Sequence, residues 1–196
     1  MIEIKDLKVK MKSLEFVFKD FTFEKGKITI ISGRNGSGKT TLLRVFASFL
    51  DYEGSLKINA NVTYNSQEPI IFNRTVYENI VYPLKVRKLD VSMYDKKIIE
   101  YSNLLDIKHL LETNALKLSS GEKMKVSIVR SIIFDPDIVL LDEPTTHLDL
   151  ESIAKLTDLI NSLKDKITFI IVTHNKTFME DLVDVEYKVG GKHVLS

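Results

Sequence analysis

The sequence predicts an α/β protein whose core is a mostly parallel β-sheet, with an antiparallel β flank and a helical insertion. Two solid apolar runs, Ile138–Leu141 and Ile167–Val172, are each followed by a helical pattern, as in strands buried on both faces of a parallel sheet. Apolar residues at every second position near the N-terminus predict antiparallel strands that bury one face. Between residues 68 and 130 the patterns are helical, which predicts the insertion.

The composition indicates one globular module and excludes several classes of protein. The 196 residues carry 28 Lys and Arg against 27 Asp and Glu, so a net charge of +1 gives no global field to hold nucleic acid or an anionic membrane. A nucleic-acid binder of this composition would need a local basic patch. The absence of cysteine excludes disulfides, thiolate zinc sites and a cysteine nucleophile, so any bound metal is expected to have oxygen ligands.

The first third of the chain predicts strands around one helix. Alternation from Ile2 to Phe23 predicts the antiparallel flank, and Lys27–Ile31 predicts a buried strand that runs into a glycine-rich stretch at 32–38. Apolar residues at helical spacing then predict a helix over Lys39–Leu50. Short strands are expected to follow over Ser55–Asn59 and Asn61–Asn65.

The rest of the chain predicts helices around the two buried strands. Within the insertion, helices are expected over Thr75–Pro83, Met93–Leu105, Ile107–Glu112 and Glu122–Phe134, the last ended by Asp135-Pro136. Helices over Glu151–Lys164 and Asn175–Leu182 follow the buried strands. A Gly190-Gly191 turn between Val185–Val189 and His193–Leu195 predicts a final hairpin. No apolar run approaches the roughly 20 residues that cross a bilayer, so no transmembrane segment is expected.

The segment from Gly33 to Thr40 matches the phosphate-binding pattern GxxxxGK[ST], between a predicted strand and a predicted helix. Glycines let consecutive backbone N–H groups point at phosphate oxygens, and the helix adds the positive end of its dipole. Lys39 is expected to contact the outer phosphates and the Thr40 hydroxyl to ligate Mg²⁺. The predicted nucleotide-binding residues are Gly33, Arg34, Asn35, Gly36, Ser37, Gly38, Lys39, Thr40 and Thr41.

Two carboxylates, Asp142 and Glu143, directly follow the first buried strand. They are therefore expected at the carboxyl end of the sheet, where α/β folds bind ligands. One carboxylate could complete the coordination of Mg²⁺, and the other could orient or deprotonate an attacking water. The alternative is a structural role as a helix or turn cap, because Pro144 and Thr145 follow.

Further short motifs follow the phosphate-binding pattern in a fixed order. They are a glutamine at 67, LSSGE at 118–122, IVLLDEP at 138–144, THLD at 146–149 and a histidine at 174. In this order and spacing the chain resembles the nucleotide-binding domain of ATP-binding-cassette (ABC) proteins, from about Ile2 to the C-terminus. The resemblance implies a P-loop NTPase fold of RecA type in one domain over 1–196, with its core at 1–67 and 131–196 and a helical subdomain at about 68–130.

The resemblance also implies roles in ATP hydrolysis with Mg²⁺ as cofactor. Gln67 matches the Q-loop glutamine that touches Mg²⁺ or the water, Asp142 the Walker B aspartate, Glu143 the general base and His174 the switch histidine on the γ-phosphate. Lys39 joins these as a catalytic residue. Taken singly, Gln67 and His174 could equally be ordinary surface residues.

A second set of residues is implied to act across a dimer. Asp149 matches the D-loop aspartate of the dimer interface. Ser119, Ser120, Gly121 and Glu122 match the signature segment that closes over ATP on the opposite subunit, so that two copies or two homologues sandwich two nucleotides. The alternative for Ser119 or Ser120 with Glu122 or Lys123 is N-terminal helix capping.

Two departures from the family pattern lead to expectations. The usual signature is LSGGQ, and Ser120 and Glu122 replace its first glycine and its glutamine, from which slower basal ATP turnover is expected. The adenine-stacking aromatic of the family would fall near Met11–Leu14, where none is present. Phe16 is close but is expected to pack in the core. Weak base selectivity, with GTP tolerated, is therefore expected.

The resemblance implies a transporter ATPase without its own channel. Its partners would be a separate transmembrane permease and a second nucleotide-binding subunit, with no nucleic acid. The chain would be cytoplasmic and would meet the inner face of the membrane only through the permease. The segment after Gln67 is similar to importer subunits, including those for tungstate or molybdate.

Two questions stay open at this point. The apolar residues after Gln67 could form a groove for a permease helix or the core of the helical lobe; they are Ile70, Ile71, Phe72, Val76, Tyr77 and Ile80. A different role is suggested by the histidine in the motif Pro144–Asp149, which is similar to ABC ATPases of the translation-factor type that act on ribosomes.

Overall fold

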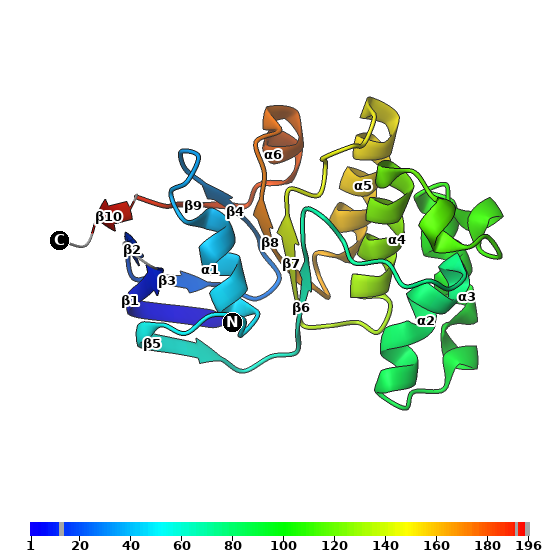
Figure 1. The fold of residues 1–196 in the computed structure, drawn as a ribbon, viewed down its shortest axis with the longest axis horizontal. Coiled ribbons are helices and arrows are strands. Elements are labelled where there is room, and N and C mark those ends of the chain that lie inside the picture. Colours follow the sequence, from blue (N-terminus) through cyan, green and yellow to red (C-terminus); the bar gives the residue numbers. More distant parts are fainter. Residues whose placement is uncertain (12–13, 191, 195–196) are drawn as a thin grey trace.

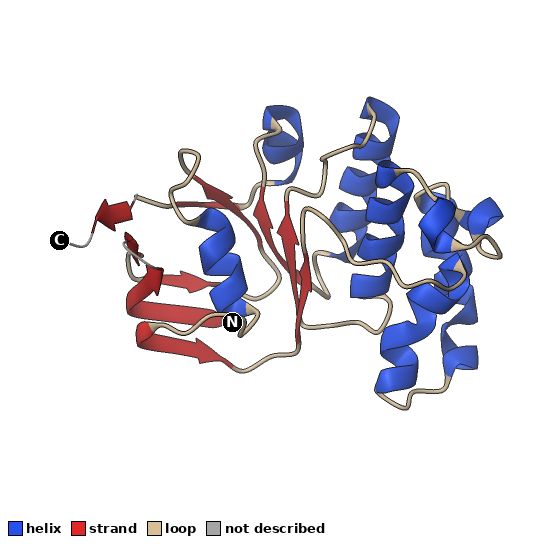
Figure 2. Cartoon of the chain, in the orientation of Figure 1, coloured by secondary structure: helices blue, strands red, loops and turns tan. Residues whose placement is uncertain are grey.

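The computed structural model describes residues 1–11, 14–190 and 192–194 and places them in two β-sheets and a group of helices (Figures 1 and 2). The predicted fold class is confirmed: a parallel sheet lies at the centre, an antiparallel sheet flanks one side and a helical layer covers the other. Within the described ranges, no helix has the combination of length and apolarity that spanning a bilayer requires.

The parallel sheet has the strand order β6-β7-β8-β4-β9. Its inner strands β7 (Ile138–Asp142) and β8 (Thr168–Val172) are buried along their whole length, as their uninterrupted apolar sequences predict. β4 (Ile28–Ser32) lies beside β8, and the outer strands are β6 (Val62–Asn65) and β9 (Val185–Lys188). Because all pairs in this sheet are parallel, the segments that follow β4, β6, β7 and β8 meet at one edge.

The antiparallel sheet is built on the long strand β1 (Ile2–Met11). One edge of β1 pairs with β2 (Leu14–Val17) and β3 (Phe21–Phe23), and the other edge pairs with β5 (Glu53–Ile58). The inward side chains of β1, among them Ile2 and Ile4, are fully buried, as the alternation predicts. β10 (Lys192–Val194) adds to the free edge of β2.

Four of the α-helices begin at residues whose side chains bind the first free backbone amides. Thr75 and Ser119 each form a capping box with the glutamate three residues later, at the starts of α2 (Val76–Val86) and α4 (Ser120–Ile132). Asp149 and Asn175 cap α5 (Leu150–Leu163) and α6 (Lys176–Leu182). The remaining helices are α1 (Lys39–Phe46), α3 (Asp95–Leu104) and short 3₁₀ turns at Val91–Tyr94, Lys108–Leu110 and Ala115–Lys117.

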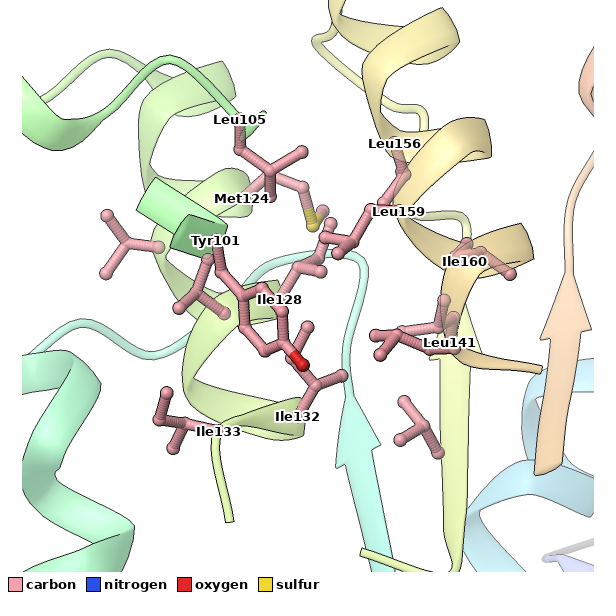
Figure 3. Packing of buried hydrophobic residues seen from close by; sticks show 14 of the residues in the cluster. Tyr101, Leu105, Met124, Ile128, Ile132, Ile133, Leu141, Leu156, Leu159 and Ile160 are labelled. Atoms are coloured by element: carbon pink, nitrogen blue, oxygen red, sulfur yellow. The ribbon is translucent and has the colours of Figure 1, made fainter. Parts of the chain in front are cut away.

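Alternate residues of β7 enter two different hydrophobic cores, one on each face of the parallel sheet. Ile138 and Leu140 pack with α1 and the antiparallel sheet. Val139 and Leu141 face the helical layer, where side chains from α3, α4 and α5 meet (Figure 3). This layer contains Met124, Ile128 and Ile132 of α4 at helical spacing. The sheet is therefore held rigidly from both sides.

Three local expectations differ from the structure. The predicted C-terminal hairpin is wrong: β9 lies parallel to β4 in the central sheet, whereas β10 pairs with β2 in the other sheet. Gly191 and Leu195, part of that expectation, lie outside the described residues. The helix predicted to reach Leu50 ends at Phe46, where Ala47 and Ser48 bond back to the last turn. The helix expected at 107–112 is only a 3₁₀ turn.

Candidate functional site

A cavity of about 520 Å³ lies at the edge where the parallel strands end. It is lined by residues from the loop before α1, from the ends of β7 and β8, and from the segment after β6. The lining residues are Phe16, Asn35, Gly36, Gly38, Lys39, Thr40, Thr41, Gln67, Glu143, Thr146, Val172 and His174. All four residues predicted to act in catalysis, Lys39, Gln67, Glu143 and His174, are in this set.

The loop between β4 and α1 has the backbone shape that its glycines permit. Gly33, Gly36 and Gly38 have φ of 147°, 73° and 103°, values at which other residues are strained. A Cβ on Gly38 would also lie 2.6 Å from the Phe16 ring. The Lys39 ammonium donates to the carbonyl oxygens of Gly33 (2.9 Å) and Arg34 (3.2 Å), so the loop curls around its own lysine.

This loop provides an anion-binding surface. The first backbone N–H groups of α1 have no partner within the helix and face a cavity that also receives a lysine. Asn35, Gly36 and Thr41 line that cavity, whereas Arg34 is exposed outside it. The buried Ser37 hydroxyl has no hydrogen-bond partner among the described residues. The chemistry suits the phosphates of a nucleotide.

Oxygen donors for a cation converge beside Lys39. The Thr40 hydroxyl donates to Asp142 Oδ1 at 3.0 Å, and the Tyr64 hydroxyl donates to Asp142 Oδ2 at 3.0 Å. Asp142 is buried, and these two hydroxyls give each of its carboxylate oxygens a hydrogen-bond donor. A hydroxyl and a carboxylate next to a phosphate site are the donors that Mg²⁺ uses with nucleotides, so Thr40 and Asp142 fit this ion.

Glu143 and His174 form a pair at the same cavity. His174 Nε2 lies 3.2 Å from Glu143 Oε1, and the His174 backbone N–H donates to Glu143 Oε2 at 3.1 Å. Glu143 has φ 52° and is 14% exposed at its side chain, whereas that of His174 is 55% exposed. Burial raises the pKa of Glu143, against a smaller lowering by His174. A carboxylate with a raised pKa beside a phosphate site is suited to accept a proton from water.

The LSSGE segment lies at a second hollow of about 250 Å³ and not at the first cavity. This hollow is lined by Ser119, Gly121, Glu122, Lys125, His147, Leu148, Asp149 and Ser152. A Cβ on Gly121 would lie 2.6 Å from the His147 carbonyl oxygen, so the two motifs pack tightly together. The structure thus places LSSGE beside His147–Asp149 of THLD and away from the phosphate-binding loop, whereas Thr146 of THLD lines the first cavity. Ser120, in the first turn of α4, is not among the residues that line the second hollow.

Within one chain, Ser119 and Glu122 act as the helix-capping residues that the alternative interpretation of this segment predicts. Ser119 accepts from the Glu122 N–H, and Glu122 Oε2 accepts from the Ser119 N–H at 2.8 Å and the Ser119 hydroxyl at 2.7 Å. These hydrogen bonds lower the pKa of Glu122. Asp149 caps α5 through the Ser152 N–H at 2.8 Å. The caps orient the first turns of α4 and α5 toward the hollow.

Phe16 both packs in the core and borders the nucleotide cavity. It is 7% exposed, lies in the core cluster under the antiparallel sheet and contacts Gly38. The expected core packing is therefore confirmed, and the ring also forms part of the cavity wall. Residues 12 and 13, within the stretch Met11–Leu14 where no aromatic occurs, lie outside the described residues.

The segment after Gln67 divides between core and surface. Val76 and Ile80 are fully buried in the helical layer, and Ile71 and Tyr77 pack against it. Ile70 is 75% exposed. The core alternative therefore holds for these four packed residues, and the groove for a permease helix stays a prediction.

Sequence reasoning did not identify Tyr64 or Asn79, which both support the site. Tyr64 binds Asp142, as described above. Asn79 is fully buried in α2; its side chain accepts from the Phe72 N–H at 2.9 Å and donates to the Phe72 and Thr75 carbonyls at 3.1 and 2.9 Å. For Asn79 the indication in the sequence is a polar residue on the apolar face of a predicted helix, whereas the role of Tyr64 depends on a contact 78 positions away.

Comparisons with known proteins agree with this geometry. The model of the family described as ABC transporter matches residues 19–146. The tungstate uptake system ATP-binding protein TupC of Peptoclostridium acidaminophilum is 36% identical over 174 residues, covering 83% of this chain and 81% of that protein. The molybdate/tungstate import ATP-binding protein WtpC of Pyrococcus abyssi is 32% identical over 193 residues, covering 90% of this chain but only 55% of that protein.

Among solved structures, an archaeal ribosome recycling factor, in complex with a ribosomal stalk protein, matches with a TM-score of 0.82 and 27% identity. The match covers 95% of this chain and 36% of that one, so the chain spans about a third of the recycling factor. A family match over more than half of the chain, and relatives above 30% identity, show that the chain belongs to the ABC transporter family and is one of its nucleotide-binding ATPase subunits.

Proposed function

We propose that this chain is the ATPase subunit of an ABC importer, in which ATP-driven closure of two cassettes is coupled to transport through a separate permease. One observation carries the proposal. The phosphate-binding loop with its catalytic groups and the LSSGE segment occupy two separate hollows of one chain. An ATP site that uses both therefore needs a second cassette, which makes closure of a dimer the natural power stroke.

In this proposal the first cavity binds the nucleotide. The N–H groups from Asn35 to Thr41 and the Lys39 ammonium bind the phosphates. Thr40 and Asp142 hold Mg²⁺, with Gln67 at the same cavity wall as a further oxygen donor. When bound, the ion would neutralise negative charge that develops on the phosphate oxygens. The proposed subdomains, a core at 1–67 and 131–196 and a helical part at about 68–130, would position these groups.

Hydrolysis in this proposal is phosphoryl transfer to water. Glu143 takes a proton from the attacking water while the water oxygen forms a bond to the γ-phosphorus. The bond between the γ-phosphorus and the oxygen that stays on ADP breaks, which gives ADP and phosphate. His174, held against Glu143, contacts the γ-phosphate. Ser119 and the first amides of α4 would reach the same phosphate from the other subunit, and Asp149 would lie in the interface. We propose that ATP turnover is slower than with an LSGGQ signature, because Glu122 adds negative charge near the γ-phosphate.

The permease would dock beside the segment after Gln67. Ile70 is exposed there, and the Phe72 and Tyr82 ring centres lie 4.6 Å apart with the ring planes tilted by 48°. The Arg130 guanidinium lies 5.3 Å from the Phe72 ring centre and donates to the Ile70 carbonyl at 2.7 Å, which holds the segment in place. Docking there would bring the chain to the cytoplasmic face of the membrane through the permease alone.

An oxyanion is the cargo that we propose, with tungstate or molybdate preferred, because two relatives at 32–36% identity are named for these anions. The ribosome-acting alternative is less favoured, since the recycling factor is less similar at 27%. Uptake of labelled tungstate, molybdate and phosphate by cells lacking the chain, restored by the wild type but not by Lys39→Ala, would test the cargo. Unaltered uptake of all three would contradict it.

The sandwich mechanism is tested with Glu143→Gln. This change removes the proposed base but keeps a side chain that can accept the His174 N–H, so ATP should be retained between two subunits. Size-exclusion chromatography should show a dimer with ATP and Mg²⁺ and a monomer without them. Glu143→Gln combined with Lys39→Ala is the matched control and should remain monomeric. A monomer under saturating ATP would contradict self-association and point to a different partner cassette.

A further inference from the structure

Tyr64 connects β6 to the buried carboxylate of β7. The two strands are neighbours in the sheet (Figure 1). Tyr64 is paired with Leu140, and the Tyr64 hydroxyl reaches Asp142 Oδ2 at 3.0 Å. The other oxygen of Asp142 accepts from Thr40 at 3.0 Å. Each oxygen of the carboxylate therefore has its own hydroxyl donor, one on each side.

The Tyr64 side chain is itself held in place. Its ring meets the Phe49 ring edge-on, with centres 5.7 Å apart and planes at 86°. The ring also borders a hollow between the end of α1 and strands β5 and β6, lined by Phe46, Phe49, Ile58 and Val62 among others. Because backbone pairing fixes one end and the rings fix the middle, the hydroxyl has little freedom to leave Asp142.

The two donors act differently on the proposed Mg²⁺ site. When Thr40 donates its proton to Asp142, its oxygen lone pairs stay free to bind an ion in the nucleotide cavity, which Thr40 lines. This holds only while Asp142 keeps its orientation. A buried carboxylate that lost the Tyr64 bond could rotate about its last torsion and would release Thr40 from its orientation.

We propose that Tyr64 is a positioning residue for the metal: by holding Asp142 Oδ2, it fixes the carboxylate and the Thr40 hydroxyl in the orientation that binds Mg²⁺ with the nucleotide. The inference rests on the nucleotide and Mg²⁺ function proposed above for this cavity. Partners of this kind, which orient metal ligands without touching the metal, typically change metal affinity or activity by about 10- to 100-fold when removed.

The test is Tyr64→Phe, which keeps the ring and removes only the hydroxyl. The affinity for metal in the ADP complex is measured with Mn²⁺ by electron paramagnetic resonance, and the ADP affinity in EDTA by calorimetry. We expect Tyr64→Phe to weaken metal binding about 10-fold and to leave the metal-free ADP affinity unchanged. The Mg²⁺ concentration for half-maximal ATPase activity should rise by a similar factor, with most of kcat regained at saturating Mg²⁺.

Tyr187→Phe is the matched control. The Tyr187 hydroxyl likewise donates a hydrogen bond, to the Lys19 carbonyl at 2.8 Å, and burial raises the pKa of both tyrosines to about 12. This variant should lose a similar bond without any change in metal affinity. Equal metal affinity in wild type and Tyr64→Phe would overturn the positioning role, as would an equal loss in both variants. Absence of metal-dependent ADP binding in the wild type would instead refute the proposed function of the cavity.

Discussion

At the scale of single residues, the features that suit Glu143 to its proposed role as a base also lower the stability of the fold. Its side chain is largely buried at the wall of the cavity, and its backbone adopts φ 52°, a conformation that costs a non-glycine residue free energy. Burial raises the pKa of its carboxyl group, so the charged form is less stable in the folded protein than in water. The ionised Glu143 carboxyl group therefore lowers the free energy of unfolding, and this loss can be measured.

This cost predicts a pH-dependent stabilisation by Glu143→Gln. A carboxyl group whose pKa is higher when folded binds protons more tightly in the folded state, so its ionisation lowers the free energy of unfolding as pH rises through that range. We expect Glu143→Gln without nucleotide to melt above the wild type at pH 7–8, with the difference narrowing toward pH 4.5. Thermal unfolding across this pH range measures it.

Glu122→Gln is the control of opposite sign. Hydrogen bonds from Ser119 lower the pKa of Glu122, so its ionised form adds stability above its usual pKa, and this contribution is lost as pH falls through the lowered value. Glutamine keeps the capping geometry but not the charge. This variant should therefore melt at or slightly below the wild type at pH 7–8. Equal melting of Glu143→Gln and the wild type at pH 8 would contradict the burial argument.

Residues in contiguous motifs could be predicted from the sequence because their geometry is local. Lys39 and Thr40 lie at the start of the helix that the loop glycines introduce, so spacing alone places them at the cavity. The positions of Gln67 and His174 in the same cavity followed only from the whole array of motifs. Tyr64 could not be predicted, because its role depends on β6 lying beside β7, and Tyr64 is 78 positions away from Asp142.

At the scale of elements, the segment from Ile70 to Thr75 is held to the helical layer by polar contacts. Asn79 of α2 binds both backbone groups of Phe72 and the Thr75 carbonyl, and Arg130 of α4 binds the Ile70 carbonyl. Ile71 also packs against the helical layer, whereas Ile70 is exposed. The hydrogen bonds add to this packing in holding the segment between Gln67 and the helices.

Asn79→Ala should release this segment. The change leaves the Phe72 N–H and carbonyl groups without their partner and opens a small cavity in α2, so we expect a loss of about 2–3 kcal/mol in the free energy of unfolding. Urea denaturation measures the loss. Asn103→Ala, at an exposed site in α3, is the matched control and should change stability by less than about 0.5 kcal/mol. Equal effects of both changes would show that Asn79 does not anchor the segment.

Element type was predicted better than element pairing. Both buried strands and the helices after them follow from composition and period, which are local properties. The prediction of a C-terminal hairpin was wrong because the sequence Gly190-Gly191 favours a hairpin locally. In the structure, β9 pairs instead with the free edge of β4, in parallel. Pairing depends on which edges the rest of the fold leaves open, and a short sequence window carries no information about them.

At the scale of the whole molecule, the mechanism proposed above divides one reaction between the two hollows. The rigid parallel sheet holds both of them, since Glu143 follows β7 directly and Asp149, a few residues later, caps α5 at the second hollow. With C2 symmetry, whatever the loop of one subunit contacts on its partner is contacted in return. Two identical composite sites would therefore form together, each using one hollow from each chain.

This arrangement predicts complementation between two inactive variants. Lys39→Ala removes the ammonium from the first hollow, and Gly121→Ala places a Cβ against the His147 carbonyl in the second. In a head-to-tail dimer of the two, one composite site combines both defects while the other site has neither. We therefore expect a mixture to regain ATPase activity that each variant lacks alone, with the gain greatest at equal amounts. Melting curves of the separate variants would confirm that both fold. If two folded variants regained no ATPase activity on mixing, the two hollows would not combine across a dimer, and the prediction would be wrong.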